Sequence, residues 1–370
     1  SNLSSPLYSG YVTSSSSKDN VVDFTIGGLA ANTTYYYGIE VNGAVSSDTN
    51  RRGRFKTFPS GASSFKFAFA SCGSYNEPGQ QVYDAIKNEN PLFFLSMGDL
   101  HYNDTNVTQT SAYWNNYKAI LSTVNQAGLF RDVSLAYVWD DHDSAGNDSS
   151  KTSVGMPYAQ QAYRDYVPSY TLATSSGPIN QAFTVGRARF ILSDLRSLRD
   201  PSGNTDSSSK TTMGATQKTW LKNEFLNAKN SGAKVIFWVS SFPYIANSAG
   251  SDNWGSYTYE RREIADYLKA NNIRNVVILS GDMHALAFDN GTNSDYATGG
   301  GMPLRVCHAA ALARSGSIKG GPYSTPAIAG TGQYGMMEVT DTGGTSVTLR
   351  FVGKHYTSGI KIDQTFTVTP

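Results

Sequence analysis

From residue 65 onward, short apolar runs alternate with longer segments of helical periodicity. Strands are expected at residues 65–70, 91–97, 135–139, 181–185, 188–193, 234–240 and 275–280. Helices are expected at residues 79–88, 112–124, 215–229 and 259–271. This alternation is typical of layered α/β folds, and uninterrupted apolar strands indicate sheets that are covered on both faces. Residues 336–370 are again strand-like, so we predict an α/β to α+β core with mixed sheets.

The N-terminal segment has a different pattern. Its β-branched and aromatic runs, at residues 21–26, 34–39 and 53–58, are separated by Gly-Gly and Asn-Gly turn signals. We therefore predict a small N-terminal β-sandwich of fibronectin or immunoglobulin type over residues 1–60. A linker over residues 59–64 would then lead into the second, catalytic domain over residues 65–370.

The composition excludes some classes of partner. A formal net charge of +1 provides no basic field for nucleic acid. No apolar stretch approaches the ~18 residues of a transmembrane helix. Charged residues make up 16% of the chain, below the ~25% of typical soluble domains. This polar but uncharged composition suits export, so we expect a secreted or periplasmic protein whose signal peptide has been removed.

Several predicted strands end directly in residues that can bind metals. The segments are Ala70-Ser71-Cys72, Gly98-Asp99-Leu100-His101-Tyr102, Asp140-Asp141-His142-Asp143, Ser240-Ser241-Phe242-Pro243 and Gly281-Asp282-Met283-His284. In α/β sheets, sites assemble outside the carboxyl ends of strands. Taken singly, each segment also has a structural explanation: Asp99 suits a helix cap or a turn, and Cys72 suits an apolar core. Their recurrence at strand ends favours one shared site.

The acidic segment Asp140-Asp141-His142-Asp143 favours a cation, because closely spaced carboxylates cannot all ionise cheaply. A solvated acidic loop is the alternative. An EF-hand is excluded, since Ala145 and Thr152 occupy positions that require oxygen ligands. The chain has only two cysteines, which excludes a disulfide scaffold. A single Cys72–Cys307 bridge and a metal-bound Cys72 thiolate both stay open.

The order and spacing of these motifs resemble known phosphoesterases. Gly98-Asp99-x-x-Tyr102 resembles the purple acid phosphatase motif, in which the Asp bridges two metals and the Tyr binds ferric iron. Asp141-His142-Asp143 stands where calcineurin-like phosphoesterases carry Asn-His-Glu, and Asp282-x-His284 stands where they carry His-x-His.

Two substitutions resemble the pattern of the alkaline phosphatase D (PhoD) family: Cys72 for the first Asp, and Asp282 for the first His of the late pair. Further matching stretches are Asp194-Leu195-Arg196, Phe242-Pro243 and the segment from Asn253 to Arg261. The resemblance covers essentially the whole chain and implies a layered metallophosphoesterase domain, with a central β-sandwich of mixed sheets flanked by helices. Asp143 departs from the usual Glu, so its role and that of Asp140 stay open.

The resemblance implies a mixed metal centre. Fe(3+) would be bound by Cys72, Asp99, Tyr102 and His284, and Ca(2+) by Asp99, Asp141 and Asp282. A thiolate with a phenolate suits trivalent iron, and carboxylates suit calcium. A hydroxide that bridges the metals would attack phosphorus.

Other residues are candidates for contacts with substrate. His142 is expected to hydrogen-bond the phosphoryl group or to protonate the leaving oxygen. Arg196 is a candidate phosphate clamp, or alternatively a salt-bridge partner of Asp194 or of the Asp140 loop. Trp254 and Tyr257 are candidates for the mouth of the site, or else for packing.

We therefore expect a phosphoric ester hydrolase. Its substrate would be a small-molecule phosphomonoester or phosphodiester, or a phospholipid headgroup in a phospholipase D-like reaction. A calcium-stabilised secreted binding or adhesion module is the alternative from another class, but it leaves Cys72, Tyr102 and His284 without a purpose. A cytoplasmic zinc-type phosphoesterase is disfavoured by Cys72 and by the missing first His.

Overall fold

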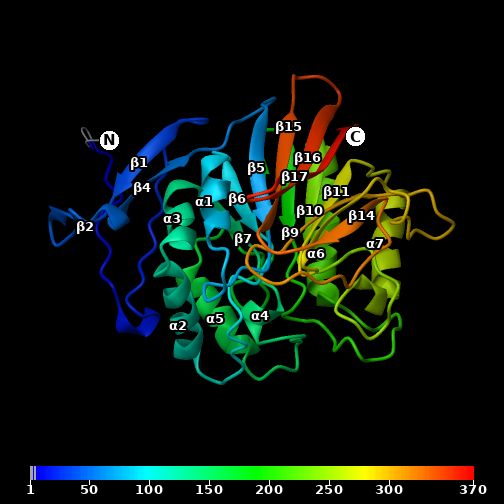
Figure 1. Cartoon of the computed structure of the whole chain (residues 1–370), viewed down its shortest axis with the longest axis horizontal. Helices are drawn as coiled ribbons and strands as arrows, with labels where there is room; N and C mark the ends of the chain where they lie inside the picture. Colours follow the sequence, from blue (N-terminus) through cyan, green and yellow to red (C-terminus); the bar gives the residue numbers. More distant parts are fainter. Residues whose placement is uncertain (1–2, 4–5) are drawn as a thin grey trace.

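A computed structural model describes residue 3 and residues 6–370. Two sheets face each other at the centre, and helices cover their outer faces (Figure 1). The six-stranded sheet has the order β17 (Gly359–Val368), β16 (Val347–His355), β15 (Gln333–Thr340), β5 (Phe65–Ala70), β6 (Phe93–Ser96) and β7 (Ser134–Tyr137). The seven-stranded sheet has the order β14 (Thr325–Ala329), β12 (Ala285–Asp289), β13 (Arg305–Ala309), β11 (Val276–Ser280), β10 (Val235–Ser240), β9 (Ala188–Leu192) and β8 (Gln181–Val185).

The helices lie in two outer layers. Helices α1 (Gln81–Asn88) and α3 (Asn125–Asp132) pack on the six-stranded sheet, and α6 (Gly214–Asn230) and α7 (Thr258–Ala270) pack on the seven-stranded sheet. Helices α2 (Thr110–Leu121) and α5 (Met156–Tyr166) pack on each other, and the single-turn α4 (Asp141–Ser144) follows β7. Short 3-10 turns occur at Ser16–Lys18, Thr49–Arg51 and Trp254–Ser256.

Aromatic side chains fill the space between the two sheets. Phe67 of β5 stacks on Phe93 of β6 with ring centroids 5.0 Å apart. From the opposite sheet, Phe190 and Phe237 meet the Phe67 ring edge-on at 5.2 and 5.3 Å. Because helices cover the outer faces, every residue of β6, β10 and β11 is buried, as the continuous apolar runs predicted. The expected layers of mixed sheets and helices are therefore confirmed.

The N-terminal segment differs from the prediction. Within described residues 6–60, β1 (Thr34–Gly38) pairs with β4 (Arg52–Lys56) and β2 (Glu40–Val41) pairs with β3 (Ala44–Val45), while residues 21–26 are not a strand. These two ribbons are not the two packed layers of a sandwich. The first residues of the predicted 1–60 domain (1, 2, 4 and 5) lie outside the described part, and the domain boundary stays a prediction.

The β1–β4 ribbon lies against the body of the protein, beside α3 (Figure 1). The hydroxyl of Tyr37 donates to the carbonyl of Arg131 at 3.2 Å. Phe58, just after the ribbon, packs on Phe93 and Phe183 at centroid distances of 5.4 and 5.8 Å. The segment at 59–64 therefore follows a residue that is anchored in the core between the sheets.

Parallel strands in both sheets carry the loops that matter for chemistry. Strands β5, β6 and β7 are parallel, and so are β9, β10, β11 and β13. Their carboxyl-end loops meet: the Ser71 hydroxyl accepts from the Asp282 amide at 2.9 Å, and the Ser241 hydroxyl donates to Asp140 at 2.7 Å. Among the described helices, none combines the length and apolarity that spanning a bilayer requires.

The central core generates a stability prediction. Phe67→Ala should lower the free energy of unfolding by about 3–5 kcal/mol, because the fully buried ring is lost and a cavity remains between the sheets. Urea unfolding followed by tryptophan fluorescence measures the change. Phe24→Ala, at a side chain that is 45% exposed, is the matched control and should cost far less. Equal losses in both variants would contradict this description of the core.

Candidate metal centre

The structure brings together all six residues predicted as metal ligands. Each lies shortly after the carboxyl end of a parallel strand. The loop after β5 carries Cys72, the loop after β6 carries Asp99 and Tyr102, the segment after β7 carries Asp141, and the loop after β11 carries Asp282 and His284. The side chains form two groups that share Asp99.

A thiol, a phenol and an imidazole form the first group. The sulfur of Cys72 lies 3.6 Å from Oδ2 of Asp99. The hydroxyl of Tyr102 lies 3.0 Å from the same oxygen and 3.1 Å from Nε2 of His284. The sulfur and the phenol oxygen thus approach one oxygen of Asp99, and the imidazole nitrogen of His284 lies beside the phenol. Sulfur, oxygen and nitrogen donors together suit iron.

His284 is held in one orientation. Its Nδ1 lies 2.7 Å from the carbonyl oxygen of Ser315. Because a carbonyl oxygen only accepts, Nδ1 carries the proton, and the lone pair of the neutral ring is on Nε2, which faces Tyr102. Burial lowers the pKa of His284 to about 4, so the ring is neutral. A histidine that donates one ring N–H to a carbonyl and presents the other nitrogen is a typical metal ligand.

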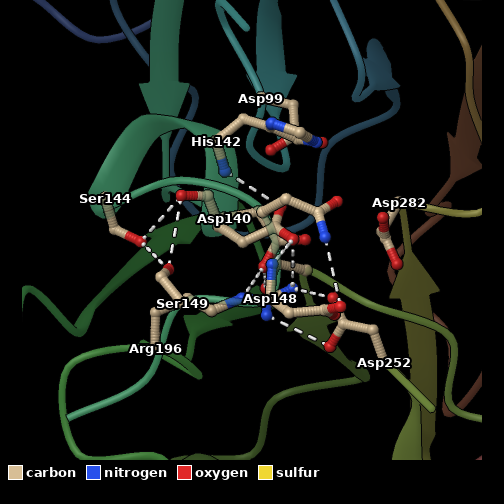
Figure 2. Close-up of polar contacts among 12 residues, drawn as sticks. Asp99, Asp140, His142, Ser144, Asp148, Ser149, Arg196, Asp252 and Asp282 are labelled. Carbon is tan, nitrogen blue, oxygen red and sulfur yellow. Dashed lines mark hydrogen bonds and ion pairs between the residues drawn. The ribbon is translucent and has the colours of Figure 1, made fainter. Parts of the chain in front are cut away.

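Carboxylates form the second group. Asp99, Asp140, Asp141 and Asp282 are all buried, and each offers an oxygen within 4.8 Å of the others. Figure 2 shows Asp99, Asp140 and Asp282 together with Asp148 and Asp252 around this space. Oδ1 of Asp99 and Oδ2 of both Asp140 and Asp282 are buried and have no hydrogen-bond partner among the described residues. Orphaned buried carboxylate oxygens are costly, and a cation would satisfy them.

The pKa shifts of these residues agree with a cation site. Burial, reinforced by neighbouring carboxylates, raises the pKa values of Asp99 and Asp282 well above their usual range. The pKa of Asp140 is raised to about 6 by burial, although Arg196 opposes this. Burial, Asp99 and Asp282 likewise raise the pKa of the Cys72 thiol. A cation in the centre would reverse these shifts and favour the ionised ligands.

The predicted ligands lie on unusual backbone. Cys72, Asp99 and Asp282 have φ angles of 60°, 56° and 69°, in the left-handed region that costs non-glycine residues about 1–3 kcal/mol. Close loop packing holds them there. A Cβ added at Gly98 would lie 2.4 Å from the Asp140 Cβ, and one at Gly281 would lie 2.5 Å from the Ser71 hydroxyl. The glycines before Asp99 and Asp282 therefore allow neighbouring loops to approach.

Asp143, whose role the sequence left open, binds backbone. Its carboxylate accepts from the amides of Asp99 at 2.5 Å, Leu100 at 2.7 Å and Asp140 at 3.2 Å. This caps the first turn of α4 and fixes the loop that carries Asp99. Asp143 thus positions a predicted ligand.

Arg196 is not at the surface of the site, which corrects its assignment as a phosphate clamp. It is fully buried, and its guanidinium pairs with Asp140 and, at 2.8 Å, with Asp252 (Figure 2). Arg199 also pairs with Asp252. The salt bridge to the Asp140 loop, the alternative that the sequence left open, is the one formed. Although burial raises it, the charges of Arg196, His142 and Lys319 hold the pKa of Asp141 below its usual range.

Trp254 and Tyr257 are also corrected. Both are fully buried in the layer between the seven-stranded sheet and helices α6 and α7. The indole of Trp254 donates to the Ser240 hydroxyl at 2.9 Å, and the Tyr257 hydroxyl donates to the Asp200 carbonyl at 2.6 Å. They support the loops behind the carboxylates and do not line the mouth.

His142 lies where a substrate contact is expected. Its ring centroid lies 3.9 Å from that of Tyr102, with the two planes tilted by 39°, and Nδ1 contacts Asp104 (Figure 2 shows His142 beside Asp99). The side chain is 14% exposed, so it borders both the centre and the solvent. Asp104 orients the imidazole, a role that the sequence did not indicate.

Three further residues at the centre were not predicted. Asp148 and Asp252 lie close enough to Asp141 to share a cation, and Nζ of Lys319 lies 2.6 Å from Oδ1 of Asp282. Asp148 follows the acidic segment closely and could have been counted with it. Asp252 and Lys319 lie in loops without a motif, so no local signal identifies them.

The Cys72–Cys307 bridge is not formed. Both thiols, which lie in the described part of the chain, are free and buried. Cys307 packs in the apolar core between the sheets, and burial raises its pKa. This leaves the Cys72 sulfur available to the group around Asp99.

Comparisons with known proteins agree with this architecture. A family model described as PhoD-like phosphatase matches residues 67–306. Alkaline phosphatase D of Bacillus subtilis (strain 168) is 26% identical over an alignment of 307 residues, and the match covers 70% of this chain and 52% of that protein. The chain thus spans about half the length of the curated relative that it matches.

Two solved structures share the fold. One, described as the structure of PhoD, aligns with a TM-score of 0.75 at 20% identity, over 95% of this chain and 78% of that one. The other is purple acid phosphatase PPD1 from yellow lupin (Lupinus luteus) seeds. It aligns with a TM-score of 0.64 at 13% identity, over 92% of this chain and 60% of that one.

The buried arginine generates a prediction. Arg196→Met should lower the free energy of unfolding by about 3–5 kcal/mol, because Asp140 loses its arginine partner while it stays buried. Thermal unfolding of the metal-free protein measures the change. The control is Arg350→Met, whose partner Asp363 lies on the surface; it should change stability by about 1 kcal/mol or less. Equal losses of stability in the two variants would show that the buried ion pairs of Arg196 contribute no more to the free energy of unfolding than a surface pair does.

Proposed function

The chain belongs to the PhoD-like phosphatase family, and from this membership we propose that it hydrolyses phosphate esters at a mixed iron–calcium centre. One observation carries the metal assignment. A single buried carboxylate, Asp99, is shared between a thiol–phenol–imidazole group and a group made only of carboxylates. Two such different donor sets side by side suit two different cations.

In this proposal, iron is held by Cys72, Tyr102 and His284 together with Asp99, and calcium by Asp99, Asp141 and Asp282. Support comes from the orphaned oxygens of Asp99 and Asp282 and from the lone pair of His284, which faces Tyr102. When bound, the ions supply positive charge for the phosphoryl oxygens and make a water-derived nucleophile available near neutral pH.

Residues of the chain itself would orient the substrate and protonate the leaving oxygen. His142, whose Nδ1 contacts Asp104, can donate from Nε2 to a phosphoryl oxygen or to the leaving oxygen when the ring carries both protons. Cleavage of the ester bond leaves an alkoxide that needs one proton, and His142 is the candidate donor. Arg196 and Asp143 fix the Asp140–Asp141 segment and the Asp99 loop.

The substrate class we propose is a small phosphomonoester or phosphodiester, with phospholipid headgroups as a further candidate. We also propose export, on the strength of the low charged share of 16%. A calcium-stabilised adhesion module would use the carboxylates but would have no use for the thiol and phenol beside them. Ferric phenolate absorbs visible light, so colour separates the two functions.

The metal assignment predicts the behaviour of the purified protein. It should contain about one iron per chain plus calcium and should absorb in the visible range. Asp99→Ala should lose the colour and at least ~10²-fold of the phosphatase activity, since Asp99 belongs to both donor sets. Metal analysis, an absorption spectrum and p-nitrophenyl phosphate hydrolysis measure these outcomes. Asp363→Ala, at a surface residue paired with Arg350, is the control. Zinc alone in a colourless, active protein would contradict the iron assignment.

A further inference from the structure

The segment between β13 and β14 crosses the centre, and we define residues 312–321 as the strap. The Ala313 amide donates to the Cys72 carbonyl at 3.1 Å, and the Ser317 amide donates to the His284 carbonyl at 3.1 Å. At its far end, the Gly321 amide donates to the Ile245 carbonyl at 2.7 Å. The strap is therefore fixed at both ends by loops of the centre.

Lys319 lies near the end of this strap. Its Nζ is 2.6 Å from Oδ1 of Asp282, and its backbone carbonyl accepts from the side-chain amide of Asn253 at 3.1 Å. A Cβ added to the next residue, Gly320, would lie 2.8 Å from the Ile245 carbonyl, so the strap has little room to shift here. The backbone thus directs the Lys319 side chain at Asp282.

The contact between Lys319 and Asp282 leaves polar atoms of both side chains available for further interactions. Oδ2 of Asp282 is buried and has no hydrogen-bond partner among the described residues, so it stays available to a cation. An ammonium has three N–H donors, and the described contacts use one, on Oδ1. The Lys319 side chain is 35% exposed, so the remaining donors can reach a ligand that enters from the solvent.

The arginines of the centre make other contacts, although Nη2 of Arg199 and Nε of Arg314 have no hydrogen-bond partner among the described residues. Arg196 and Arg199 are fully buried and paired with carboxylates. Arg314 lies 4.1 Å over the Tyr102 ring and pairs with Glu77 at 2.9 Å. Among the described cations of the centre, Lys319 thus combines contact with a predicted calcium ligand, solvent exposure and free donors.

Electrostatics give Lys319 a reason to bind an anion. The Lys319 ammonium contacts the carboxylate of Asp282 through Oδ1. A divalent ion on Oδ2 of Asp282 would place a second positive charge across the same carboxylate. Like charges at such range repel, and an anion that contacts both relieves the repulsion.

We propose that Lys319 is a catalytic residue that binds the phosphoryl group of the substrate, donating from Nζ to a phosphoryl oxygen while Asp282 holds the calcium. This inference rests on the proposed function. The ammonium neutralises phosphoryl charge from the side of the carboxylate group, and His142 contacts the same phosphoryl group from the side of Tyr102.

The test uses the metal-loaded protein and inorganic phosphate as the probe. Lys319→Met should raise the dissociation constant of phosphate, measured by isothermal titration calorimetry, about 10-fold or more, because a charge-assisted hydrogen bond is lost. Lys319→Arg should keep part of the affinity. Iron and calcium contents should equal those of the wild type in both variants. Lys56→Met, at an exposed lysine of β4, is the matched control and should leave the dissociation constant unchanged.

Two results would overturn the proposal. Unchanged phosphate affinity in Lys319→Met would show that the ammonium makes no contact with the anion. Loss of calcium together with phosphate affinity would show that Lys319 acts by placing Asp282. A wild-type protein that binds phosphate through Lys319 yet hydrolyses no phosphate ester would contradict the proposed function and leave this binding role standing.

Discussion

The structure depends on one electrostatic constraint: four aspartates are buried with their oxygens within 4.8 Å of one another. Carboxylates so close cannot all ionise without compensation. The surrounding side chains provide part of it, through the Arg196 pairs with Asp140 and Asp252 and the Lys319 pair with Asp282. Orphaned oxygens remain on Asp99, Asp140 and Asp282. These carboxylate oxygens without a partner mark the place where cations would bind.

The two-sheet frame explains how such a cluster can be held. Parallel strands of both sheets deliver their carboxyl-end loops to the same edge, and the aromatic layer around Phe67 locks the sheets together. Cys72, Asp99 and Asp282 follow their strands closely in the left-handed backbone region. Short connections to rigid strands allow these residues little movement. The stability of the core therefore offsets the cost of the strained backbone and of the buried charges.

The sequence predicted the parts of this protein whose signals are local. Strands 65–70 and 181–185 have the expected bounds, since apolar runs mark buried strands directly. Helix α5 was missed because its buried face combines small and large apolar residues with a charged one, Asp165, so the face is not uniformly apolar. The six ligand candidates could be named from the sequence because their motifs directly follow strands, and their role as ligands stays a prediction. Side-chain pairings over long separations carry no local signal, so Lys319 was missed and Arg196 was left between two roles. The aromatic pair, Trp254 and Tyr257, was assigned to the mouth, although tertiary packing buries it.

Anomalous diffraction from crystals of the metal-loaded protein, recorded on both sides of the iron absorption edge, locates iron and calcium separately. We expect an iron peak at bonding distance from Cys72 Sγ, Tyr102 Oη and His284 Nε2. We also expect a second peak without an iron edge beside Asp141 and Asp282, with Asp99 between the two. Iron bound only among the carboxylates, with the Cys72 thiol unligated, would contradict the proposed iron–calcium centre.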